Sequence, residues 1–172
     1  TVPALFEARV RQSPERTAYY ALDASGTWQG TPWKAFLESV LPLAAGLRRQ
    51  GVTTGTPVGL MARTAPTWDS IHYAALMAGG VIVGMDGHDL DENIHHIIEQ
   101  TGLTTLVVQE ANLLEKLTPA LRRRLQTVVS IDPPPEAEGA PLSLTDLRDQ
   151  GRQAPLDPAD RPAPPDPATI IF

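Results

Sequence analysis

Short apolar runs recur along the first 132 residues of the chain. They lie at residues 57–63, 81–85, 103–109 and 126–131. Because apolar and polar residues do not alternate within them, each run is typical of a strand that is buried on both faces. Amphipathic segments separate the runs. The order of strands and helices predicts an α/β fold, with a mostly parallel sheet, helices on both faces and right-handed crossovers.

The longest amphipathic segment follows Thr31 and Pro32, which have the residue types of a helix N-cap and first turn. Its apolar positions recur at helical spacing and are Trp33, Phe36, Leu37, Val40, Leu43, Ala44 and Leu47. Pro42 lies inside this segment, and because proline removes a backbone donor we expect a kink or a break there. Further helices are expected at residues 64–80, 89–102, 110–117 and 119–125.

The N-terminal residues predict a short helix and a hairpin. The helix begins near Pro3 and ends before Pro14. Two short strands follow at residues 17–23 and 27–30, and the Ala-Ser-Gly turn between them predicts that they pair as a hairpin.

The composition of the chain changes after Asp132. Ten of the 17 prolines lie in the segment 133–167, which predicts linker or surface coil with one short helix near residues 142–153. We therefore expect an α/β subdomain at residues 1–132 and a proline-rich linker at 133–167. Residues 168–172 are expected to be the first strand of a following unit that is missing, because a domain rarely ends by starting a new core element.

Charge and composition exclude several functional classes. The net charge of −6 argues against nucleic acid or an anionic membrane as the main partner. The chain has no cysteine, which excludes disulfides, thiolate catalysis and zinc–thiolate sites. No apolar run approaches the ~20 residues of a membrane helix. We therefore expect a cytoplasmic protein with no membrane span and no nucleic-acid partner.

Candidate metal ligands are concentrated between residues 86 and 96. They are Asp86, His88, Asp89, Asp91, Glu92, His95 and His96. Asp91 and His95 have the i, i+4 spacing that can hold a metal or form an ion pair. The position of the glycine does not match a calcium loop. Helix capping by Asp89 or Asp91, with acidic residues favouring the helix dipole, accounts for the same residues. We predict no metal site, and a small metal-dependent enzyme remains an alternative hypothesis.

His72 is a candidate catalytic residue between Trp68 and Leu76 on a predicted helix. Catalysis requires a neighbouring acid or nucleophile. Asp69 does not have a spacing that ensures contact. A partly buried structural histidine is therefore the favoured interpretation.

The glycines and arginines give no clear anion site. Gly79 and Gly80 lead from a helix into a strand, which reverses the dinucleotide-binding order, and they are more typical of a helix end. Arg122–Arg124 are typical of a solvated helix face. The loops after the apolar runs, with sequences MARTAP, MDGHD and VVQEA, carry no recognisable reactive set. We therefore predict no catalytic, cofactor-binding or metal residue in this chain.

The sequence nevertheless resembles the N-terminal region of the adenylate-forming enzymes, in particular the long-chain fatty-acid–CoA ligases. The resemblance rests on the order and spacing of VPALFEARVRQSPERTAYY, GLRRQGV, GTPVGLMARTAPTW, ALMAGGVIVGM, TTLVVQE and TVVSID, and it covers nearly the whole chain. The chain departs from the family in two places. MDGHDLD stands where members often have Tyr-Pro, and Pro42 interrupts a helix that is usually continuous.

The resemblance implies that a longer parent protein activates a fatty acid or another carboxylate. ATP and the acid, with magnesium, give an acyl-adenylate and pyrophosphate, and coenzyme A then takes the acyl group. In this family a strand like PATIIF leads into a loop of the form TSGTTGxPKG that embraces the ATP phosphates. Neither this loop nor the catalytic lysine has a matching position here.

The resemblance therefore predicts that this chain alone is inactive and binds no ATP, magnesium or coenzyme A. Truncation is also expected to leave apolar surface uncovered, which favours self-association. The alternative is a stand-alone α/β binding or interaction module without catalysis.

Overall fold

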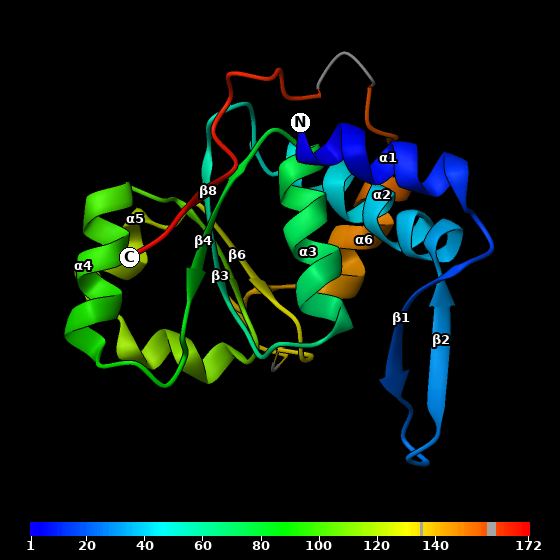
Figure 1. Cartoon of the computed structure of the whole chain (residues 1–172). Coiled ribbons are helices and arrows are strands. Elements are labelled where there is room, and N and C mark those ends of the chain that lie inside the picture. Colours follow the sequence, from blue (N-terminus) through cyan, green and yellow to red (C-terminus); the bar gives the residue numbers. More distant parts are fainter. Residues whose placement is uncertain (135, 158–160) are drawn as a thin grey trace.

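The computed structural model describes residues 1–134, 136–157 and 161–172. Its central feature is a six-stranded parallel sheet (Figure 1). The strands are β3 (Pro57–Met61), β4 (Val81–Met85), β5 (Thr105–Val108), β6 (Thr127–Ser130), β7 (Leu142–Ser143) and β8 (Thr169–Ile170). Their spatial order is β7-β6-β5-β3-β4-β8. The predicted α/β class is confirmed.

Both faces of the sheet are buried, as the uninterrupted apolar runs predicted. In β5, Val107 belongs to one apolar cluster, whereas Leu106 and Val108 belong to another. In β4, Ile82 and Val83 divide between the same two clusters. Because successive side chains of a strand point to opposite faces, the two clusters lie on opposite sides of the sheet.

Helices cover each face of the sheet (Figure 1). One layer consists of α1 (Val2–Gln12), α2 (Trp33–Arg49), α3 (Pro66–Met77) and α6 (Leu144–Gln153). The opposite layer consists of α4 (Asp91–Thr101), the 3-10 helix η1 (Ala111–Lys116) and α5 (Pro119–Arg124). The predicted helices are therefore present, although the one expected at residues 110–117 is a 3-10 helix.

Helix α2 is continuous through Pro42, so the helix is not broken at this proline, which was one of the two outcomes expected there. Val40 and Leu43, on either side of Pro42, are both buried in the core, and this packing holds the two halves of the helix together. The predicted N-cap at Thr31 is wrong. Strand β2 extends to Pro32, which precedes the helix without a side-chain cap, and Thr31 pairs with Tyr19 instead.

Strands β1 (Thr17–Leu22) and β2 (Trp28–Pro32) form the predicted antiparallel hairpin. The hairpin projects away from the sheet and its helices (Figure 1). Its inner side is attached to α2 by Tyr19, whose ring centroid lies 5.3 Å from that of Phe36. Its outer side carries exposed apolar side chains.

Part of the proline-rich segment belongs to the core of the fold. Strand β7 pairs with β6, and Leu144 and Leu147 of α6 are buried against the other helices of its layer. The predicted short helix is thus present. Residues 135 and 158–160 of the predicted linker lie outside the described residues. The division of the chain at residues 132 and 167 stays a prediction, and β8 lies beside β4 in the same sheet.

Two helices end at the glycines that the sequence predicted as their stops, but the predicted cap at the start of α4 differs from the observed one. Gly79 and Gly102 have positive φ angles of 88° and 62°, as expected of glycines that end helices. The residue that precedes α4 is Leu90, so the prediction that Asp89 or Asp91 caps this helix is wrong. Asp91 is its first helical residue, where its charge still favours the helix dipole. In the described part of the chain, no helix has the length and apolar character to cross a membrane.

Candidate functional site

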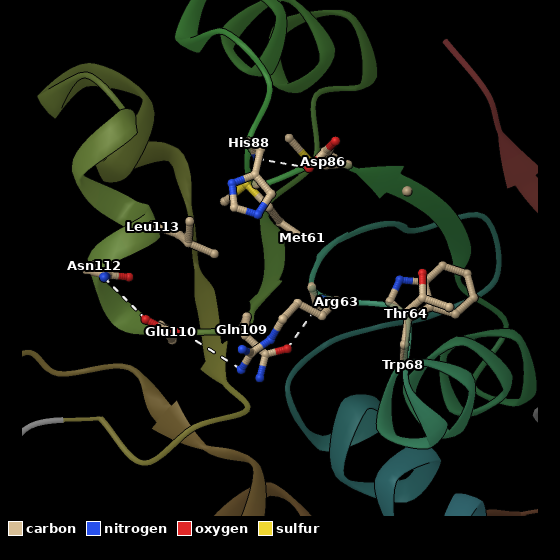
Figure 2. Close-up of a pocket in the computed structure, with 14 residues that line it drawn as sticks. Met61, Arg63, Thr64, Trp68, Asp86, His88, Gln109, Glu110, Asn112 and Leu113 are labelled. Atoms are coloured by element: carbon tan, nitrogen blue, oxygen red, sulfur yellow. Dashed lines mark hydrogen bonds and ion pairs between the residues drawn. The ribbon is translucent and has the colours of Figure 1, made fainter. Parts of the chain in front are cut away.

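A cleft of about 650 Å³ opens at the carboxyl ends of β3, β4 and β5 (Figure 2). Three loops form it, and they are the loops that follow these strands. The residues that line it are Met61, Ala62, Arg63, Thr64, Trp68, Gly84, Met85, Asp86, Gly87, His88, Gln109, Glu110, Asn112 and Leu113. Its volume lies within the range of about 300–1,000 Å³ that is usual for small-molecule sites.

The topology of the sheet explains why the cleft forms at this place. The loop after β3 leads into α3, whereas the loops after β4 and β5 lead into α4 and η1 in the opposite layer. Strand β3 lies between β4 and β5. Because the loops of neighbouring strands diverge to opposite faces, a crevice opens outside their carboxyl ends, which is where open α/β sheets bind ligands.

A network of polar side chains lies at this carboxyl edge of the sheet and connects the residues that follow β3, β5 and β6. The Arg63 guanidinium lies 3.3 Å from an Asp132 carboxylate oxygen and 3.9 Å from Glu110. The Gln109 side chain donates to Asp132 at 3.0 Å and accepts from the Arg63 backbone N–H at 3.3 Å. Arg63 and its carboxylate partners are largely exposed, so these ion pairs contribute little stability.

Trp68 forms one wall of the cleft and has His72 behind it. The two ring centroids are 4.9 Å apart in an edge-to-face arrangement. Burial lowers the pKa of His72, and the charge of Asp69 opposes this shift in part. Burial raises the pKa of Asp69, with an opposing effect from His72. His72 does not line the cleft, and its packing against Trp68 agrees with a structural role.

The candidate metal ligands between residues 86 and 96 are dispersed in the structure. Asp86 and His88 line the cleft, where an Asp86 carboxylate oxygen accepts the His88 backbone N–H at 2.9 Å. Asp89 accepts from the Leu90 N–H and the Asn93 side chain, and the bond to Asn93 is the main cause of its lowered pKa.

Three of the remaining members of this cluster lie beside groups outside it. Asp91 pairs with Lys116 at 3.0 Å, and Nε2 of His95 lies 2.7 Å from the Lys116 carbonyl oxygen. The i, i+4 pair of Asp91 and His95 is therefore not formed. The His96 ring lies 6.2 Å from that of Phe172. Within the described ranges, no group of three His, Asp or Glu side chains could hold a metal ion.

The residues that shape the cleft were not predicted as a site. The three loops were recognised at the ends of apolar runs, but their polar residues are ordinary in type. Arg63 and Trp68 follow β3, whereas Gln109 follows β5, and only the pairing of these two strands brings the two segments together. The signal available in the sequence was the position of polar residues directly after three buried strands. The other predicted candidates lie elsewhere, with Gly79 and Gly80 at a helix end and Arg122–Arg124 exposed on α5.

Comparison of the sequence with known proteins assigns the chain to one enzyme family. The profile of the family described as AMP-binding enzyme matches residues 6–172. The long-chain-fatty-acid–CoA ligase heimdall of Drosophila melanogaster is 28% identical over 142 residues, which cover 80% of this chain and 21% of that protein. Syringomycin synthase SyrB1 of Pseudomonas syringae pv. syringae is 34% identical over 109 residues, covering 63% of this chain and 17% of the synthase.

The fold is also shared with solved structures. Coronafacic acid ligase from Pectobacterium brasiliense superimposes with a TM-score of 0.77 at 14% sequence identity. The similarity covers 98% of this chain and 32% of the ligase chain. The chain thus spans about a fifth of the curated relatives named above and about a third of this solved structure.

Proposed function

Since the chain belongs to the AMP-binding enzyme family, we propose that it is the N-terminal part of an ATP-dependent acyl-CoA ligase for fatty acids or similar carboxylates. One observation carries the choice of ligase over peptide synthetase. Similarity to the long-chain ligase extends over 80% of the chain, whereas similarity to the syringomycin synthase extends over 63%.

The proposed reaction has two steps. The substrate carboxylate attacks the α-phosphorus of ATP and releases pyrophosphate, and the thiol of coenzyme A then attacks the acyl-adenylate carbonyl and releases AMP. Charge stabilisation at the phosphates, with magnesium and a lysine, is the usual means of catalysis in such reactions. A role for this chain is to supply the sheet and its carboxyl edge, to which β8 also contributes because it runs parallel to β4.

The residues of this chain do not fit Mg-ATP by themselves. Asp86 and Glu110 line the cleft and would face the phosphates, and Arg63 is the one arginine or lysine among the lining residues. Among the described residues, no group of three or more His, Asp or Glu side chains could hold a metal ion. We therefore infer that the isolated chain does not catalyse adenylation, and a cytoplasmic location remains part of the same proposal.

The test compares the full-length protein with this chain. Carboxylate-dependent exchange between ATP and pyrophosphate is measured with palmitate and with the common amino acids, and acyl-CoA products are identified by mass spectrometry. We expect palmitate-dependent exchange and palmitoyl-CoA from the full-length protein, and neither from residues 1–172. Amino-acid-dependent exchange without a CoA product would assign the protein to peptide synthesis instead. Specific Mg-ATP binding by residues 1–172 in calorimetry would contradict the proposed inactivity.

We also propose that the isolated chain associates with itself through the hairpin. Tyr20, Leu22 and Trp28 are 65%, 57% and 65% exposed. Leu22 lies opposite Trp28, and Tyr20 is two residues from Leu22, so the three side chains share one face of the hairpin. An exposed apolar face of this kind favours association because contact removes it from water.

A further inference from the structure

We propose that Lys116 is a positioning residue that latches η1 to the start of α4 and thereby fixes the opening of the cleft between η1 and the loop after β4. Lys116 is the last residue of η1 and does not line the cleft itself. The inference goes beyond the proposed function, because it concerns the shape of the cleft and requires no ligand.

Two walls of the cleft belong to separate elements that touch each other. One wall is η1, through Leu113, and the other is the loop after β4, through Gly87 and His88. A Cβ on Gly87 would lie 3.3 Å from a methyl carbon of Leu113, so Leu113 packs against this loop. In Figure 2, Leu113 projects toward the loop that carries His88. A shift of η1 would therefore change the opening of the cleft.

The helix η1 is held weakly by its own structure. A 3-10 helix has poor hydrogen-bond geometry, and none of the 6 residues of η1 is buried. The side chain of its N-cap residue, Glu110, makes no capping hydrogen bond. Leu117, which follows η1, is buried, whereas Leu113 and Leu114 pack against the core only in part. The position of η1 therefore depends on bonds to neighbouring elements.

Lys116 takes part in three such bonds, and all of them reach residues at or beside the first turns of α4. Its ammonium group donates to the Asp89 carbonyl oxygen at 2.9 Å and to an Asp91 carboxylate oxygen at 3.0 Å. Its own carbonyl oxygen lies 2.7 Å from Nε2 of His95. Because a carbonyl oxygen can only accept, Nε2 carries the hydrogen of this bond. The three bonds join the end of η1 to the start of α4.

The bond to Asp89 is the part of this latch that reaches the cleft loop. The ion pair with Asp91 contributes little by itself, because the Asp91 side chain is 55% exposed. The Lys116 side chain is only 28% exposed, and its hydrogen bond to the Asp89 carbonyl is charge-assisted. That carbonyl belongs to the backbone that connects His88 to α4. Lys116 therefore acts on a wall of the cleft from outside the cleft.

The first experiment measures the contact between the two walls by NMR of residues 1–172. Nuclear Overhauser effects between the Leu113 methyl groups and the Gly87 α protons report this contact. Lys116→Met keeps a long side chain but removes the charge and its donors, and we expect these effects to be lost. The Leu113 amide, which donates to the Glu110 carbonyl oxygen at 3.1 Å, should exchange its hydrogen roughly tenfold faster. Lys116→Arg keeps a charged donor and should preserve both readings.

Two controls separate positioning from overall stability. Lys34→Met changes the other lysine of the chain, which is exposed on α2, and should alter neither reading. The Gln109 amide donates to the Met61 carbonyl oxygen at 2.9 Å at the edge of the sheet, and its exchange rate should be the same in Lys116→Met as in the original chain. An acceleration at Gln109 as large as that at Leu113 would assign Lys116 to global stability and overturn the proposal.

The bond from His95 provides an independent check. In mildly alkaline solution, a long-range proton–nitrogen correlation spectrum should show the His95 hydrogen on Nε2. His95→Phe should speed exchange of the Leu113 amide, whereas His96→Phe, at the exposed neighbouring position, should not. The proposal is overturned if the contact between Leu113 and Gly87 persists in Lys116→Met, if Lys116→Arg loses it as completely, or if His95 carries its hydrogen on Nδ1.

Discussion

At the scale of single residues, Asp23 organises the turn of the hairpin. Its carboxylate accepts hydrogen bonds from the Ser25 hydroxyl at 2.6 Å, the Thr27 backbone N–H at 3.0 Å and the Gln29 side chain at 3.1 Å. These bonds favour the ionised form and lower the pKa of Asp23 to about 2, with the Ser25 hydroxyl as the largest cause. The turn therefore depends on a charged acceptor although it is exposed to water.

The hairpin turn is expected to loosen in acid. Because the pKa of Asp23 is about 2 in the folded chain, below its ordinary value of 3.8, ionisation stabilises the turn above about pH 4. This contribution is lost as the pH falls from about 4 toward 2. An NMR titration should show the amide resonances of Ser25 and Thr27 changing with a midpoint near pH 2. A midpoint near 3.8 would show that the hydrogen bonds do not form in solution.

Substitution provides a second check on the same carboxylate. Asp23→Asn removes the charge and should speed the hydrogen exchange of the Thr27 amide at neutral pH, because an amide oxygen is a weaker acceptor than a carboxylate. Glu15→Gln changes an exposed carboxylate outside the hairpin and should leave that exchange rate unaltered.

At the scale of elements, the contact between α2 and α6 is made by glycines. A Cβ on Gly151 would overlap the Pro42 carbonyl oxygen and lie 2.6 Å from the Gly46 nitrogen. A Cβ on Gly46 would in turn overlap the Leu147 carbonyl oxygen. The neighbouring groups are backbone atoms, which cannot rotate away as a side chain could. The two helices therefore approach each other closely only because both positions lack a side chain.

Gly151→Ala is expected to lower the free energy of unfolding by about 2 kcal/mol. Alanine gains about 1 kcal/mol of helix propensity over glycine, but overpacking against rigid backbone costs about 3 kcal/mol and prevails. Urea unfolding followed by circular dichroism measures the difference. Gly84→Ala is the matched control, because a Cβ there meets nothing within 4 Å, and it should change the free energy by less than about 0.5 kcal/mol. A stabilising Gly151→Ala would show that the helices separate in solution.

At the scale of the whole molecule, the hairpin and the sheet differ in how far their apolar side chains are exposed to water. The sheet buries its apolar side chains on both faces, whereas the hairpin exposes three large ones. Charges oppose the pairing of sheet edges, and Asp23 is the single charged residue of the segment 17–32. The hairpin is therefore the part of the molecule where association is expected.

Sedimentation velocity should show an average sedimentation coefficient that rises with the concentration of residues 1–172. The double substitution Leu22→Ser and Trp28→Ser should remove this dependence, since it replaces two of the three exposed apolar side chains of the hairpin. Leu5→Ser is the control, because Leu5 is 73% exposed on α1, away from the hairpin. A chain that stays monomeric at all concentrations would contradict the proposal.

Much of the fold could be predicted because its signals are local. Buried runs such as 81–85, glycines such as Gly102 and the turn of the hairpin act through neighbouring residues. The starts of α2 and α4 were assigned to the wrong residues. The residue before each of these helices has an extended backbone, and its side chain makes no capping hydrogen bond. The start of each helix therefore has no local sequence pattern that could be detected.

The sequence by itself determined the class of fold and the parallel sheet, because these follow from the order and spacing of apolar runs, and the resemblance of its motifs to known enzymes indicated the family. Only the tertiary structure decided where the cleft lies and which residues line it. Arg63 and Trp68 follow β3, His88 follows β4 and Gln109 follows β5, and these three segments meet because β3 lies between β4 and β5. Strand order depends on long-range packing, which no short window of sequence records. The same reason explains why the short helix expected within the proline-rich linker is buried against the core.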